Sequence, residues 1–209
     1  MFHVKHHDLP GKEQVLEACD VLGTRPPADF YEKLRVYLDI LTDCSTRLNL
    51  VGPGETERLW GRHVLESVSY GAYLKKAPVV DIGTGAGFPG VILALLGFPV
   101  KMIEPRGKRC GFLETALREC GTKAEVVCSR VEQAGPFSSG TQFTSRAVKK
   151  PEDMLGLLRG VASGDFSLLI RVSHRGMIIN GNHSLHDLPV PPLDREGFLL
   201  QYSHSCSNE

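Results

Sequence analysis

Hydrophobic positions in the first third of the chain follow a helical period. Between residues 29 and 50, apolar side chains recur every three or four positions, and most charged residues fall on other faces. This spacing predicts an amphipathic helix. A second helix is expected over residues 55–74, although Gly61 and Gly71 lower its helical propensity. We expect residues 1–76 to form an N-terminal helical cap and residues 77–209 to form an α/β domain.

The hydrophobic pattern changes near residue 78. Short apolar runs now alternate with stretches of helical period that end at Gly97 and Gly121. Such alternation predicts right-handed crossovers and a parallel sheet with helices on both faces. The expected strands lie at 78–83, 99–104 and 124–129, and the expected helices at 89–97 and 107–121.

Charge and cysteine content narrow the class of protein. The chain has 24 Lys and Arg residues against 24 Asp and Glu residues, so it has no overall attraction to nucleic acid or to an anionic membrane. Its six cysteines form no C-x-x-C pair, which favours reduced thiols in the cytoplasm. No apolar stretch approaches the roughly 18 residues of a membrane span, and the first residues lack a signal-peptide core. We expect a soluble, unexported protein without a membrane partner.

The segment "VVDIGTGAGFPG" at 79–90 carries the first candidate chemistry. It places four glycines directly after the first predicted strand. Glycine allows a backbone to bend sharply and to approach a ligand closely, and open parallel sheets bind ligands at the carboxyl ends of their strands. The segment therefore predicts a ligand-binding loop, with a plain turn as the alternative.

A dinucleotide is one possible ligand of this loop. Gly85, Gly87 and Gly90 match the pattern G-x-G-x-x-G. Counted from the first glycine after the strand, however, the third glycine slot holds Phe88. A pyrophosphate also needs free N–H groups at the helix start, and Pro89 removes one. These features argue against an NAD-dependent oxidoreductase without excluding it.

S-adenosylmethionine is the second possible ligand, since it has a cationic sulfonium and no phosphate. Asp81 could face its ammonium group, and Glu104, at the end of the second strand, could accept both ribose hydroxyls. Gly83, Gly85 and Gly87 would let the backbone approach it. Taken singly, the two carboxylates could equally be a turn cap and a solvated strand end.

At this point the sequence resembles the RsmG (GidB) family of bacterial 16S rRNA guanine-N7 methyltransferases. The resemblance implies a class I S-adenosylmethionine-dependent methyltransferase fold, Rossmann-like, with a mostly parallel seven-stranded sheet. It also implies 16S rRNA or the small ribosomal subunit as partner. We expect no DNA partner and a monomeric protein. The motifs that carry the resemblance, in family order, are "LNLVG" (48–52), "RHVLESV" (62–68), "VVDIGTGAGFPGVILAL" (79–95), "GKRCGFL" (107–113), "SRVEQ" (129–133) and "TSRAV" (144–148).

The resemblance also implies roles for single residues. Gly83 and Phe88 would line the cofactor, Val131 and Glu132 would lie against its adenine, and Arg146 would sit where cofactor and target base meet. Guanine N7 carries an in-plane lone pair at neutral pH, so the reaction needs positioning rather than a general base. Arg146 could supply it by donating to guanine O6, and a surface arginine is the alternative.

RNA contacts are harder to identify. Residues 101–130 include seven basic and four acidic residues. This excess of positive charge is consistent with a phosphate-contacting surface or with an ordinary solvated helix. The histidines lack cysteine partners and lie in polar segments, so no metal site is expected. The candidate RNA-binding residues are Asn49, Arg62, His63, Lys108, Arg109 and Arg130.

The sequence departs from the family ahead of "TSRAV". About three residues of the strand that leads to Thr144 are missing, which predicts a central strand shortened by roughly 10 Å or a displaced Arg146. Where the family has a strand ending in Lys-Gly, only Arg171 or Arg175 could substitute. A non-catalytic ribosome-binding protein with the same fold therefore stays open as an alternative.

Overall fold

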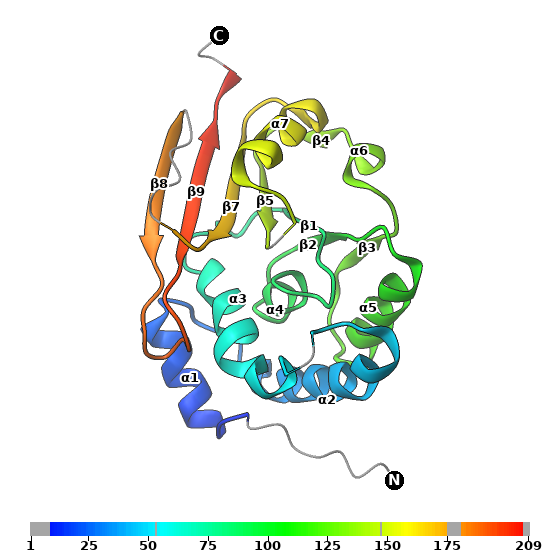
Figure 1. The fold of residues 1–209 in the computed structure, drawn as a ribbon, viewed down its shortest axis with the longest axis vertical. Helices are drawn as coiled ribbons and strands as arrows, with labels where there is room; N and C mark the ends of the chain where they lie inside the picture. The colour runs from blue at the N-terminus through cyan, green and yellow to red at the C-terminus, as the bar shows by residue number, and fades with distance from the viewer. Residues whose placement is uncertain (1–8, 53, 147, 175–180, 207–209) are drawn as a thin grey trace.

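A seven-stranded sheet forms the centre of the computed structural model, which describes residues 9–52, 54–146, 148–174 and 181–206 (Figure 1). The strand order is β3-β2-β1-β5-β7-β9-β8. The first five strands of that order run parallel, and β9 and β8 pair antiparallel at one edge. The predicted mostly parallel, seven-stranded sheet is confirmed. Its strands are β1 (Val79–Ile82), β2 (Val100–Ile103), β3 (Glu125–Val127), β5 (Thr141–Ser145), β7 (Phe166–Val172), β8 (Asn182–Asp187) and β9 (Phe198–His204). A separate two-stranded ladder joins β4 (Phe137–Ser138) and β6 (Ala162–Ser163).

Helices cover both faces of the sheet, as predicted. Helices α1 to α5 share one hydrophobic core on one face, and α6 and α7 share a second core on the other. Because side chains alternate along a strand, Val79 enters the first core and Val80 the second. The helices are α1 (Lys12–Val21), α2 (Phe30–Leu48), α3 (Leu65–Tyr70), α4 (Gly90–Leu95), α5 (Gly107–Glu119), α6 (Val131–Ala134) and α7 (Pro151–Val161). In the described ranges, no helix is both long and apolar enough to cross a bilayer.

The prediction of one continuous α-helix over residues 55–74 is wrong. The segment begins as a 3₁₀ turn, η1 (Thr56–Arg58), continues as a π-helix, η2 (Leu59–Val64), and only then becomes α3. At Gly61 a Cβ atom would lie 1.8 Å from the Asp194 carboxylate, so another loop packs directly on the backbone here. The α-helix ends at Tyr70, where Gly71 follows as its C-cap.

The strand that leads to Arg146 is present, and its shortening relative to the family stays a prediction. Strand β5 has five residues, all buried, and pairs in register with β1 from Gln142 to Ser145 and with β7 over its whole length. A tight turn at Gly140, which has φ 83°, leads from β4 straight into β5. Arg146 therefore directly follows a central strand that is paired on both sides.

Candidate functional site

The glycine loop lies between β1 and α4 and has a backbone that only glycine adopts readily. Gly83, Gly85 and Gly87 have φ values of 67°, 62° and 104°. Side chains also fill the space beside two of them. A Cβ on Gly83 would lie 2.5 Å from Val148 Cγ2, and one on Gly87 would lie 2.5 Å from Val91 Cγ2. The sharp bend predicted from the sequence is confirmed.

A cavity of about 430 Å³ opens above this loop at the carboxyl ends of β1, β2 and β5. The loop forms its floor, and residues 50–52, which follow α2, form part of its wall. It has the size of a site for a small molecule. Seven of the candidate residues line it, namely His63, Gly83, Gly85, Phe88, Glu104, Arg109 and Arg146.

Glu104 is fixed at the floor of the cavity by the backbone. Its Oε2 accepts a hydrogen bond of 3.1 Å from the N–H of Gly85, and its Oε1 accepts one of 2.9 Å from the N–H of Arg106. The Arg109 guanidinium lies 4.0 Å away. Each carboxylate oxygen has a further lone pair, so Glu104 can still accept hydrogen bonds from a ligand's hydroxyl groups.

Asp81 lies beneath the loop and has no exposed surface. Its Oδ2 accepts a 2.9 Å hydrogen bond from the N–H of Gly90, and its Oδ1 accepts a 2.8 Å bond from the Thr144 hydroxyl. Burial raises the pKa of this carboxyl to about 6. Asp81 ties β1 to β5 and to the start of α4 and does not line the cavity. Its predicted contact with the ammonium group of the cofactor stays a prediction, and Asp81 does not reach the cavity directly.

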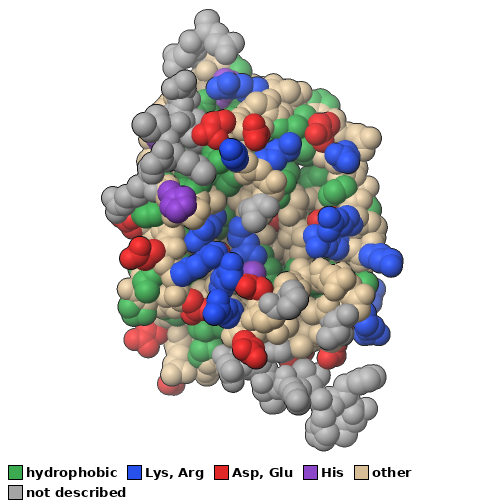
Figure 2. Space-filling view, viewed as in Figure 1, with side chains coloured by type: hydrophobic (Ala, Val, Ile, Leu, Met, Phe, Trp, Pro, Cys, Tyr) green, Lys and Arg blue, Asp and Glu red, His purple; other side chains and the backbone are tan. Residues whose placement is uncertain are grey.

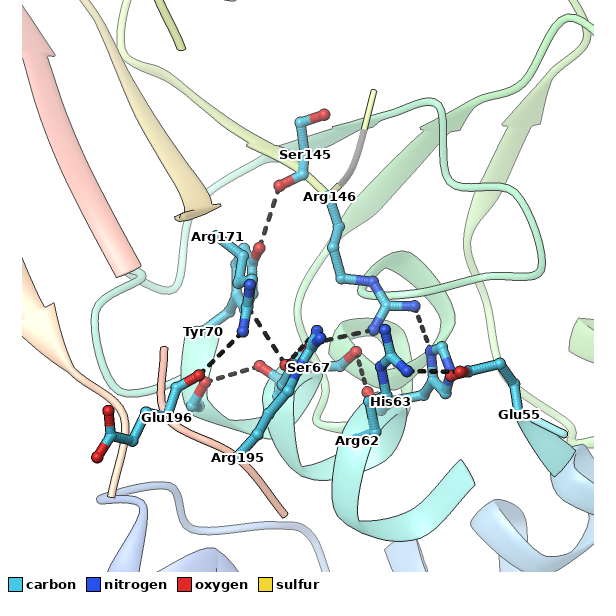
Figure 3. Close-up of polar contacts among 12 residues, drawn as sticks. Glu55, Arg62, His63, Ser67, Tyr70, Ser145, Arg146, Arg171, Arg195 and Glu196 are labelled. Atoms are coloured by element: carbon cyan, nitrogen blue, oxygen red, sulfur yellow. Dashed lines mark hydrogen bonds and ion pairs between the residues drawn. The ribbon is translucent and has the colours of Figure 1, made fainter. Parts of the chain in front are cut away.

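Arg146 is held in place by His63, Phe88 and Glu66, and Figure 3 shows its contact with His63. Its guanidinium carbon lies 5.2 Å from the ring centre of Phe88, and its NH2 group donates a 2.6 Å hydrogen bond to Nδ1 of His63. NH1 lies 3.4 Å from Oε2 of Glu66. The other ring nitrogen of His63 donates to Glu55 at 2.8 Å. Burial and the charge of Arg146 lower the pKa of His63 to about 4, so its ring is neutral at pH 7.

The two residues that the resemblance predicts to contact the cofactor's adenine lie apart from this cavity. Val131 is buried in the core beneath α7, and Glu132 is exposed on α6. Neither lines the cavity, nor does Gly87, whose open side is filled by Val91. Their contact with a cofactor stays a prediction.

The RNA-binding candidates are split between several places. Asn49 ends α2 in a left-handed conformation, and its carbonyl accepts a 3.4 Å hydrogen bond from Arg109. Arg62 pairs with Glu55 and lines a second, neighbouring cavity. Lys108 and Arg130 are exposed and line neither cavity.

Three buried side chains near the cavity escaped the sequence prediction. The Tyr37 hydroxyl donates a 2.6 Å hydrogen bond to the Ala86 carbonyl in the glycine loop, and Tyr70 donates one of 3.0 Å to Ser145. Glu66 contacts the arginine beyond Ser145. Helical periodicity marks the tyrosines only as core residues. Glu66 lies inside the motif "RHVLESV", which is the one signal that could have found it.

Two solved structures share the fold. The Escherichia coli protein yhhF superposes with a TM-score of 0.53 at 17% identity, over 75% of this chain and 92% of that one. An S-adenosylmethionine-dependent methyltransferase from Aquifex aeolicus gives a TM-score of 0.52 at 16% identity, over 76% and 97% of the two chains. Identities this low support a common fold alone, and the predicted class I methyltransferase fold is confirmed.

Two sequence relatives have higher identity to this chain than these structures do, and both are named "Ribosomal RNA small subunit methyltransferase G". The protein of Paramagnetospirillum magneticum is 39% identical over 60% of this chain, and the match spans 62% of its own length. That of Mycolicibacterium vanbaalenii is 35% identical over 87% of this chain and 76% of the relative. The family model for GidB, rRNA small subunit methyltransferase G, matches residues 30–181. The chain therefore belongs to the GidB family.

Proposed function

We propose that this protein transfers a methyl group from S-adenosylmethionine to N7 of a guanine in 16S rRNA. Membership of the GidB family supports this proposal. The observation that carries it is the pairing of Glu104 and Arg146 on one cavity above the glycine loop. One side chain suits a ribose and the other suits a guanine edge.

The hydrogen bonds at the start of α4 favour S-adenosylmethionine over NAD. The N–H of Gly90 donates to Asp81 and that of Val91 donates to the Gly87 carbonyl, while Pro89 has no N–H. A pyrophosphate would find these donors already used. The cavity instead offers the Glu104 carboxylate and a glycine backbone that a ligand can approach closely. Both features suit a nucleoside with free ribose hydroxyls. When bound, S-adenosylmethionine supplies a methyl group activated by its positive sulfur.

Positioning is the chemical task of the protein in this proposal. Guanine N7 already carries its lone pair, and the protein must hold it in line with the methyl group. The Arg146 guanidinium can donate to guanine O6 from a fixed orientation, because His63 and Phe88 hold it. His63 is neutral at pH 7 and adds no repulsion to the cationic sulfonium. A fixed donor needs little reorganisation during the reaction.

We further propose that the protein acts as a monomer in the cytoplasm on 16S rRNA or the small ribosomal subunit. Residues 1–76 would serve as a helical cap over the domain of residues 77–209. A non-catalytic ribosome-binding role is less well supported, because it would follow from a displaced Arg146. Arg146 lines the same cavity as Glu104.

Two measurements test the proposal. Calorimetry with S-adenosylhomocysteine and with NADH compares the two cofactor classes directly. We expect micromolar binding of the first and none of the second, and the reverse result would refute the proposed cofactor. Mass spectrometry of 16S rRNA nucleosides from cells with and without the protein then tests the reaction. A 7-methylguanosine that persists in cells without the protein would argue for another enzyme.

A further inference from the structure

A second cavity, of about 490 Å³, adjoins the first and is strongly basic. The two cavities share His63, Arg146 and Val148. Figure 2 shows Lys and Arg side chains gathered in the middle of this face of the molecule, with a His side chain among them. Among the described residues that line the second cavity, Glu66 is the one acidic side chain, and the cations are Arg62, Arg146, Lys149, Lys150, Arg171 and Arg195.

Glu66 contacts three of these arginines, which come from distant parts of the chain. Figure 3 shows the three, Arg146, Arg171 and Arg195. Its side chain is 1% exposed. Its Oε1 accepts hydrogen bonds of 3.1 Å from both Nε and NH2 of Arg195, and the Arg171 Nε lies 3.3 Å from the same oxygen. Arg146 approaches Oε2 at 3.4 Å. Thus a residue of α3 fixes side chains from the end of β5, from β7 and from the loop before β9.

The charge of this cluster is not balanced by Glu66. Three guanidinium groups face one carboxylate, and Arg146 and Arg171 are only 15% and 11% exposed. Burial lowers the pKa of Arg171; Glu66 opposes that effect, and repulsion from Arg195 and Arg146 adds to it. The buried Nε of Arg171 has no hydrogen-bond acceptor in suitable geometry among the described residues. An anion in the cavity would relieve this repulsion.

We propose that the second cavity binds a phosphodiester group of the RNA substrate, next to the nucleotide whose base reaches Arg146, and that Glu66 is the positioning residue of this phosphate site. The inference rests on the proposed function for the identity of the substrate. Guanidinium groups in fixed orientations match phosphate oxygens, and one phosphate accepts several such donors. A nucleotide carries its phosphate close to its base, and the two cavities meet at Arg146.

The salt dependence of RNA binding measures this phosphate contact. The logarithm of the binding constant falls linearly with the logarithm of salt concentration, with a slope set by the number of phosphates neutralised. We expect the double variant Arg171→Gln, Arg195→Gln to bind 16S rRNA about ten- to a hundredfold more weakly. Its slope should be smaller by about 0.7 to 0.9, which corresponds to one lost phosphate contact.

Arg118→Gln is the matched control. Its side chain is 70% exposed and lines a cavity at the opposite, amino ends of the strands. This variant removes the same type of charge and should keep the wild-type slope. If the double variant has the wild-type slope, or if Arg118→Gln lowers the slope equally, the proposal is overturned. Should the double variant not fold, Arg195→Gln alone serves, because Arg146 and Arg171 still compensate Glu66.

A second measurement distinguishes RNA from a free anion. If inorganic phosphate at low millimolar concentration stabilises the wild type but not the double variant against heating, while the RNA salt slopes are equal, the site serves a small anion instead. Failure of the proposed function gives a different result. In that case the double variant shows the smaller slope, yet the wild type forms no 7-methylguanosine.

Discussion

The guanidinium of Arg146 donates a 2.6 Å hydrogen bond to Nδ1 of His63 and so joins the end of β5 to η2. A protonated ring could not accept this bond. The opposite ring nitrogen donates to Glu55, which fixes the tautomer. The orientation of the proposed catalytic arginine therefore depends on a neutral histidine.

The stability of the protein should depend on the protonation of His63. Burial and Arg146 lower its folded-state pKa to about 4, whereas the unfolded chain takes up the proton near its usual value of about 6.5. The unfolded state therefore binds more protons between these values, and stability is lost as pH falls from about 6.5 to about 4. The loss should be at most about 3.5 kcal/mol. Urea unfolding at several pH values measures it.

His63→Gln provides the reference for this pH dependence. Glutamine can accept from Arg146 and donate to Glu55 without titrating. Asp81 acts in the opposite direction, because its raised pKa of about 6 gives stability at low pH that is lost as pH rises. The difference between wild type and His63→Gln removes that contribution. A difference that does not change between pH 4 and pH 6.5 would show that His63 is not buried as described.

Gly87→Ala should destabilise the loop by about 2 kcal/mol. Gly87 has φ 104°, and an added Cβ would lie 2.5 Å from Val91 and 3.0 Å from the Tyr37 hydroxyl. Gly111→Ala, inside α5, is the control, since a Cβ there meets nothing within 4 Å. It should be stabilising by about 0.5–1 kcal/mol. Equal effects of the two substitutions in urea unfolding would contradict the loop geometry.

Glu104→Ala should weaken cofactor affinity about ten- to a hundredfold, because two ribose hydroxyls lose a charged acceptor. The binding of RNA should not change. Calorimetry with S-adenosylhomocysteine measures the first quantity, and a filter-binding assay measures the second. Glu114→Ala, at an exposed position of α5, is the matched control and should bind the cofactor normally. Unchanged affinity in Glu104→Ala would remove Glu104 from the cofactor site.

Arg146→Ala should lower the turnover number at saturating cofactor, because an orienting contact that is strongest in the transition state appears in kcat. It should also raise the pKa of His63, which loses the charge of Arg146. Arg146→Lys keeps a charge without the fork, so the histidine pKa should stay low while turnover still falls. Steady-state kinetics and NMR titration separate the two effects. Wild-type turnover in Arg146→Ala would exclude its proposed role.

The sequence predicted the architecture where local patterns decide it. The alternation of short apolar runs with stretches of helical period predicted the positions of β1, β2, β3, α4 and α5. This works because the spacing of hydrophobic residues in a segment reflects which of its faces is buried. The glycine loop was also predictable, since positive φ values at Gly83, Gly85 and Gly87 demand glycine. Local patterns failed at η2, where the close approach of Asp194 to Gly61 is a tertiary contact.

The basic cavity could not be predicted from local pattern. Arg146, Arg171 and Arg195 lie far apart in the chain, and only the folded sheet and α3 bring them to Glu66. The effect of the inferred deletion before Thr144 could not be predicted for a related reason. Counting residues against the family cannot show whether a strand or the turn before it is shortened, and here β5 pairs with strands on both sides.

The most direct test of the account is methyl transfer by the purified protein. The full chain is incubated with 16S rRNA and S-adenosylmethionine that carries a ¹³C-labelled methyl group, and the nucleosides are analysed by mass spectrometry. We predict labelled 7-methylguanosine in the wild-type reaction and little or none with Arg146→Ala. A wild-type protein that binds both cofactor and RNA but forms no labelled 7-methylguanosine would contradict the account and favour the non-catalytic alternative.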